Sequence, residues 1–122
     1  MNSAQQLEGI WQAISAVVSG QEIPAGEVNT IRLTLTTTRF TTQRGAETLF
    51  DSSYTADPTT MPMQIEMIGT GGDFEGKPAL GIYAFEGETL QLCYKMPGFL
   101  RPTDFTSAAG SGAFLITLKR IE

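Results

Sequence analysis

The sequence predicts an all-β fold: an antiparallel up-and-down barrel of about eight strands with a short N-terminal helical turn. Short runs of alternating apolar and polar residues follow one another, and hairpin turns separate most of them. Gly9-x-Trp11 opens the first of these runs, and Arg120 closes the last. In a small closed barrel the first and last strands are neighbours. The Arg120 guanidinium can therefore stack on the Trp11 indole, a contact of roughly 0.5–2 kcal/mol that plugs one barrel end.

The N-terminal segment up to Val18 has apolar residues at helical spacing, but Gly9 interrupts that pattern and Ala16-Val17-Val18 suits a strand. We therefore expect a helical turn over about Ser3–Glu8 and then a strand from about Ile10 to Val18. The connector that follows contains Pro24, which suits the first position of a short helix. This connector is expected to form a small lid over one end of the barrel.

Period-two alternation then predicts the remaining strands. They are expected at about Ile31–Leu35, Arg39–Arg44, Thr48–Ala56, Met63–Ile68, Ala79–Phe85, Thr89–Lys95 and Ala113–Ile121. Glu86-Gly87 is a two-residue hairpin signal that would pair Tyr83 with Leu90. Ile31 at the start of its strand is expected to face the interior, as are Phe114, Ile116 and Leu118 in the last strand. Arg120 shares a face with Leu118, so it is expected to point inward at the barrel mouth.

Size and composition predict one domain, residues 1–122, with a single core. The net charge is −5, and without a basic cluster we expect neither nucleic acid nor an anionic membrane as a partner. No run approaches the roughly 20 apolar residues of a membrane span. The first residues lack a basic lead and an apolar stretch, which favours a cytoplasmic location.

The absence of histidine and the presence of a single cysteine limit the kinds of catalytic and metal site that the chain can form. The chain has no histidine, which removes the commonest general base and metal ligand. Cys93 is the single cysteine, so no intrachain disulfide and no thiolate metal cluster are possible. We therefore expect no cofactor and no metal site, and Cys93 is interpreted as a buried small hydrophobe. The paired acids in Asp73-Phe74-Glu75 and Glu86-Gly87-Glu88 are typical of solvated turns, so no catalytic residue is assigned.

The opening Leu7-x-Gly9-x-Trp11 resembles the lipocalin and calycin superfamily, in which a late Arg stacks on that Trp. Nearly the whole chain is similar to a family of small bacterial lipocalin-like domains, abundant in planctomycetes, whose function is not established. The motifs that carry the similarity are Leu7–Trp11, Tyr54–Pro58, Gly81–Tyr83, Gly87–Leu90 with Cys93, Pro97-Gly98, Arg101–Phe105 and Leu118–Arg120. The resemblance implies a lipocalin-like β-barrel and transfers no catalytic residue. The chain departs from the wider superfamily in its short length, its lack of a disulfide and its lack of a C-terminal helix.

A barrel of eight strands is just wide enough either to be filled by side chains or to hold one small ligand, and both alternatives stay open. The tyrosines are either hydroxyl donors to a ligand or structural residues at the rim. Arg101 either binds a ligand carboxylate or satisfies local carbonyls, and Phe105 either joins a binding loop or seals the barrel. Candidate ligand-binding residues are Leu33, Leu35, Phe40, Tyr54, Met67, Tyr83, Leu92, Tyr94, Arg101 and Phe105, and the residues expected to close the barrel are Gly9, Trp11 and Arg120.

The leading functional hypothesis is a non-catalytic binding module that holds a small, largely apolar ligand. Gly20–Val28 and Met96–Phe105 would gate the interior. A second hypothesis is an accessory, inhibitor or other protein-interaction domain that uses outward threonines at 34, 36–38 and 41–42. A third is a cofactor-free isomerase or cyclase, which would need an acid or base with a shifted pKa inside a pocket.

Overall fold

The structure is a computed structural model that describes residues 7–69 and 75–121, apart from the side chains of residues 49 and 50. Most of the helical turn expected at Ser3–Glu8 lies outside these ranges, although Leu7 is helical. Asp73 and Phe74 of the acidic segment Asp73-Phe74-Glu75 also lie outside them. No helix within the described ranges combines the length and the apolar character needed to cross a bilayer.

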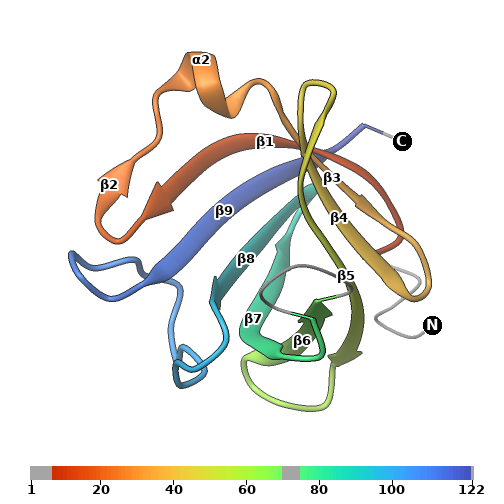
Figure 1. The fold of residues 1–122 in the computed structure, drawn as a ribbon, viewed down its shortest axis with the longest axis vertical. Coiled ribbons are helices and arrows are strands. Elements are labelled where there is room, and N and C mark those ends of the chain that lie inside the picture. The colour runs from red at the N-terminus through yellow and green to blue at the C-terminus, as the bar shows by residue number, and fades with distance from the viewer. Residues whose placement is uncertain (1–6, 70–74, 122) are drawn as a thin grey trace.

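Eight of the described strands form a closed antiparallel barrel. Each strand pairs with the next along the chain, and pairing of β1 with β9 closes the sheet (Figure 1). The elements are β1 (Gly9–Val18), β2 (Gln21–Glu22), α2 (Ala25–Val28), β3 (Ile31–Leu35), β4 (Arg39–Arg44), β5 (Glu47–Asp57), β6 (Met63–Gly69), β7 (Pro78–Glu86), β8 (Thr89–Lys95) and β9 (Ala113–Arg120). The two-residue β2 pairs with the end of β1 beside the barrel. The predicted barrel is confirmed, and its strands begin and end close to the expected residues.

The two ends of the chain meet at the Trp11 end of the barrel. Trp11 pairs with Leu33 on one side and with Arg120 on the other. The Arg120 guanidinium carbon lies 4.3 Å from the centre of the Trp11 ring, and Trp11 Nε1 donates a hydrogen bond of 2.9 Å to the Leu7 carbonyl. Arg120 also donates to the carbonyl of Glu8. The predicted stack is confirmed, but Arg120 is exposed, so it covers the buried indole from the solvent side.

A β-bulge in β1 explains the helix-like spacing of this segment. The register with β9 shifts between Ala13 and Ser15, and Ile14 is exposed. Trp11 and Ala13 are buried before the bulge, and Ala16 is buried after it. The extra residue lets both halves of one strand turn their apolar side chains inward. A spacing of three between buried positions therefore arises in a strand.

The hairpin between β7 and β8 turns one residue later than predicted. Glu86 pairs with Thr89, so the two turn residues are Gly87 and Glu88, and Tyr83 pairs with Leu92 rather than with Leu90. Gly87 has a φ of 60°, which glycine adopts without the clash that a Cβ would introduce. The turn is placed where its first residue can be glycine.

Aromatic side chains fill the half of the barrel next to Trp11. The rings of Trp11 and Phe85 lie 6.4 Å apart, and Phe85 meets Tyr83 edge-on at 6.0 Å. Phe40 meets Tyr54 edge-on at 6.4 Å. These rings belong to one buried cluster that extends through the barrel interior. Because an eight-stranded barrel is narrow, bulky rings close this half to ligands.

The long segment between β8 and β9 packs on the outside of the barrel. Phe105 packs with Leu115 against a second buried cluster formed by Ile82, Cys93 and Ala113. Ser107 Oγ donates to the Ala113 carbonyl at 2.7 Å, which ties the end of the loop to the start of β9. The loop therefore covers the outer face of β7–β9 and gives the barrel a second, smaller apolar cluster.

Candidate ligand-binding site

A pocket of about 320 Å³ lies at the barrel end opposite Trp11. Its walls come from the ends of β1 and β4, from Tyr94 near the end of β8, and from the starts of β3 and β9. The residues that line it are Ala16, Val18, Ile23, Glu27, Ile31, Thr42, Arg44, Tyr94, Met96, Phe114 and Ile116. The walls are mostly aliphatic and aromatic, which is the usual composition of a small-molecule site.

Charged residues stand only at the mouth of this pocket. Glu27 on α2 and Arg44 at the end of β4 are both exposed, and Arg44 pairs with Glu47 at 3.3 Å. The deeper part is closed by residues such as Ala16 and Ile116, which carry no charge. The arrangement suits an apolar ligand that enters past a polar rim.

The connector after β1, which the sequence predicts as a lid over one barrel end, forms one side of the pocket mouth. The Ile23 amide donates to the Ala16 carbonyl at 2.8 Å, which holds the connector against β1. The side-chain amide of Gln12 donates to the carbonyls of Asn29 and Ile31 at 3.0 and 3.1 Å. These bonds anchor both ends of the segment that carries α2. Ile23 and Glu27 are thereby placed in the pocket wall.

Tyr94 is held firmly inside the pocket. Its ring stacks on that of Phe114, with centres 5.1 Å apart and an angle of 12° between the planes. On another side Phe40 meets it edge-on at 6.4 Å. Across the strand lies Gly81, where an added Cβ would come within 2.7 Å of the Tyr94 Cβ. The absence of a side chain at Gly81 therefore makes room for this tyrosine.

Among the candidate ligand-binding residues, Tyr94 lines the pocket and seven others belong to the packed interior. These seven are Leu33, Leu35, Phe40, Tyr54, Met67, Tyr83 and Leu92, and each is at most 5% exposed. Three residues expected to face inward, Ile31, Phe114 and Ile116, do line the pocket. The interior is thus filled at one end and open at the other.

The three tyrosines are buried strand residues and do not stand at the rim. Tyr54 donates its hydroxyl proton to the Thr36 carbonyl at 2.7 Å. Burial raises the pKa of Tyr54 to about 12, and the Glu8 carboxylate adds to this shift. Burial also raises the pKa of Tyr83 to about 12, with a contribution from Asp57. For Tyr94 burial alone raises the pKa to about 12, so its phenol is neutral at pH 7 and is not a general base.

Arg101 and Phe105 lie outside the barrel, away from the pocket. The guanidinium of Arg101 donates to the carbonyls of Ile65 and Gly81 at 2.9 and 2.6 Å, which matches the structural alternative for this residue. It borders a polar groove of about 420 Å³ on the outer face of β5 and β6. This groove is larger than the barrel pocket, but its lining is polar. Of the segment Met96–Phe105, it is Met96 that lines the barrel pocket.

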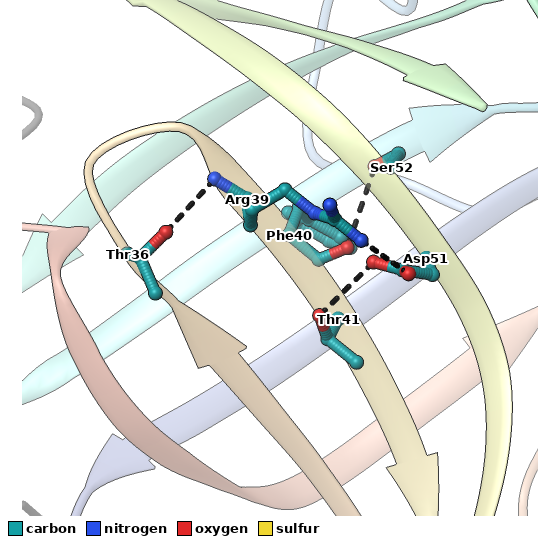
Figure 2. A network of polar contacts seen from close by, with 6 residues as sticks. All are labelled: Thr36, Arg39, Phe40, Thr41, Asp51 and Ser52. Carbon is teal, nitrogen blue, oxygen red and sulfur yellow. Dashed lines mark hydrogen bonds and ion pairs between the residues drawn. The ribbon is translucent and has the colours of Figure 1, made fainter. Parts of the chain in front are cut away.

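The threonines expected to face outward divide between the two faces of the sheet. Thr41 does face outward and donates to Asp51 Oδ1 at 3.2 Å, beside the ion pair of Asp51 with Arg39 (Figure 2). The sequence analysis predicts Thr42 on the outer face, and this prediction is wrong. It is 9% exposed and lines the pocket, because it follows Phe40 by two residues and so shares the inward face.

Neither Cys93 nor the acidic side chains have the surroundings of a reactive or metal-binding site within the described residues. Cys93 is fully buried, and burial raises the pKa of its thiol. Its sulfur lies 3.5 Å from the Thr106 carbonyl, which it approaches as a weak donor. Within residues 7–69 and 75–121, no three acidic or thiol side chains gather in a way that could hold a metal ion.

Comparison with known proteins leaves the site to be interpreted from its own geometry. No protein-family model, curated protein or solved structure matches the chain.

Glu27, Thr42 and Arg44 are the polar pocket residues that the sequence interpretation did not select. Alternation along β4 from the buried Phe40 is a signal that could have identified Thr42 and Arg44.

Proposed function

We propose that this protein is a non-catalytic binding protein that holds a small, largely apolar ligand in the pocket at the open end of its barrel. The observation that carries the proposal is the pocket itself, with apolar walls and charges only at its mouth. At roughly 30 Å³ for each water-sized group, its volume accommodates about ten non-hydrogen atoms. A bicyclic aromatic compound or a short alkyl chain has this size.

The similarity to small bacterial lipocalin-like domains supports the same proposal. A meander barrel plugged at one end by an Arg-on-Trp stack and hollow at the other is suited to holding one ligand. We propose that the chain belongs to these domains. Within the family the ligand-holding end would be the open one, which α2 borders.

A pair of adjacent substitutions on β1 tests the binding function. Val18 faces the pocket, whereas Val17 pairs with Leu115 on the opposite face of the sheet. Val18→Trp is expected to fill the pocket and to weaken binding of 2-methylnaphthalene at least tenfold. Val17→Trp adds the same side chain outside and is expected to leave binding within about twofold of wild type. Equilibrium dialysis measures the affinity, for which we expect a Kd of about 1–100 µM.

Circular dichroism first shows that both variants are folded, so that a difference in affinity can be assigned to the pocket. Equal binding by the two variants contradicts a ligand in this pocket, as does the absence of saturable binding to wild type of both 2-methylnaphthalene and 2-naphthol. Native mass spectrometry of gently purified wild type gives an independent check. A retained small molecule that is missing from the Val18→Trp variant is the expected finding.

A further inference from the structure

The pocket contains two hydroxyl groups that have no hydrogen-bond partner within the described part of the chain. They belong to Tyr94 on β8 and Thr42 on β4. Tyr94 is 7% exposed and Thr42 is 9% exposed, so protein encloses most of each side chain. A hydroxyl in such a site bonds water or a ligand, because leaving it unsatisfied is costly.

Both hydroxyls face space that water or a ligand can occupy. Among the described residues no side-chain oxygen is at once fully enclosed and unpartnered. The oxygens of Tyr94 and Thr42 consequently border open space, and the space that both side chains line is the pocket. Tyr54 differs, because its buried hydroxyl is already bonded to the Thr36 carbonyl.

We infer that the ligand is an amphiphile whose inner end carries a neutral hydrogen-bonding oxygen, an alcohol, a phenol or a ketone, which Tyr94 binds with help from Thr42. This inference rests on the proposed function and names the class of ligand. A carboxylate at this depth would be desolvated without a cation beside it, since Arg44 stands at the mouth and is paired with Glu47. A plain hydrocarbon would leave both hydroxyls unsatisfied.

The position of Tyr94 is fixed before the ligand arrives. Phe114 stacks on one face of its ring and Phe40 packs edge-on against it. A donor held in place in this way loses little side-chain freedom when it binds. Tyr94 is therefore a specificity-determining residue as well as part of the wall.

Two ligands of equal size test the inference. 2-Naphthol and 2-methylnaphthalene differ only in a hydroxyl against a methyl group, and both are neutral at pH 7. Each is titrated into wild type and into Tyr94→Phe, and the ratio of the two affinities is compared between the proteins. The ratio cancels the greater hydrophobicity of the methyl compound. We expect the relative preference for the hydroxyl compound to fall about threefold to tenfold in Tyr94→Phe.

Matched variants separate this effect from a change in folding. Tyr54→Phe removes a hydroxyl that is bonded to protein, and it is expected to leave the affinity ratio unchanged. Thr42→Val keeps the shape of the side chain, and it is expected to lower the preference by a smaller factor than Tyr94→Phe. Thermal unfolding of each variant shows that it is folded at the temperature of the titration.

The possible failures are distinguishable. If both ligands bind wild type but the ratio stays within twofold in Tyr94→Phe and in Thr42→Val, the inference is overturned and the proposed function stands. If neither ligand binds wild type, the proposed function fails, and the inference fails with it.

Discussion

Replacing Trp11 with alanine is expected to lower the free energy of unfolding by about 4–5 kcal/mol. Trp11 is 2% exposed and lies against Phe85, so its removal leaves a large cavity at the plugged end of the barrel. Truncation of a buried Trp to Ala typically costs about 3–5 kcal/mol. Loss of the exposed Arg120 stack, worth about 0.5–1 kcal/mol, and of the donor to the Leu7 carbonyl places the expected cost in the upper part of this range.

Urea denaturation followed by far-ultraviolet circular dichroism measures this change without relying on the fluorescence of the removed indole. A small domain has about 5–15 kcal/mol of stability, so the variant should unfold at a much lower urea concentration. Ile14→Ala is the matched control. Ile14 lies on the same strand but is 51% exposed, and its truncation should cost less than about 1 kcal/mol. A Trp11→Ala midpoint equal to that of wild type would refute the barrel-plug reasoning.

Three further predictions concern ionisation and close packing. All three tyrosines have pKa values raised to about 12, so the stability they contribute is complete below pH 10, where unfolded tyrosine ionises, and is lost between pH 10 and 12. Absorbance at 295 nm should show tyrosinate forming together with unfolding, whereas ionisation near pH 10 in folded protein would contradict this. Gly81→Ala should cost about 1–3 kcal/mol, because its Cβ would crowd Tyr94, whereas Gly26→Ala has nothing within 4 Å and should be neutral or slightly stabilising in the same urea assay. Hydrogen bonding to Arg39 lowers the pKa of Asp51, so this pair stabilises the fold above about pH 4 and is lost as the pH falls through the lowered value. Asp51→Asn should therefore show a smaller fall in melting temperature between pH 7 and pH 3 than wild type, and an equal fall would count against the pair.

The candidate site was predictable only in part. Alternation placed Ile31, Phe114 and Ile116 on the inner face, and the structure puts all three in the pocket wall. Tyr94 was selected together with Tyr54 and Tyr83, which the structure places in the packed interior. Residue spacing reports which face of a strand a side chain occupies, but it does not report how densely that part of the barrel is filled.

The position of Phe105 and the residue spacing in β1 both depend on long-range geometry. Phe105 was a candidate for the binding loop, yet it packs on the outer face against Leu115. The route of a long loop across a barrel depends on apolar residues far away in sequence, here Ile82 and Cys93. The helix-like spacing in β1 is similar, because a bulge is fixed by pairing with β9 rather than by the strand alone.

Residue alternation and the covalent order of the hairpins predict the strands, their order around a closed barrel and the stack of Arg120 on Trp11, because few other arrangements bury the apolar faces. Which end of the barrel is solid and which is hollow does not follow from these patterns and is known from the packed fold. That difference depends on how the rings of residues distant in sequence pack. It leaves Tyr94, and not Tyr54, with an unused hydroxyl in the pocket.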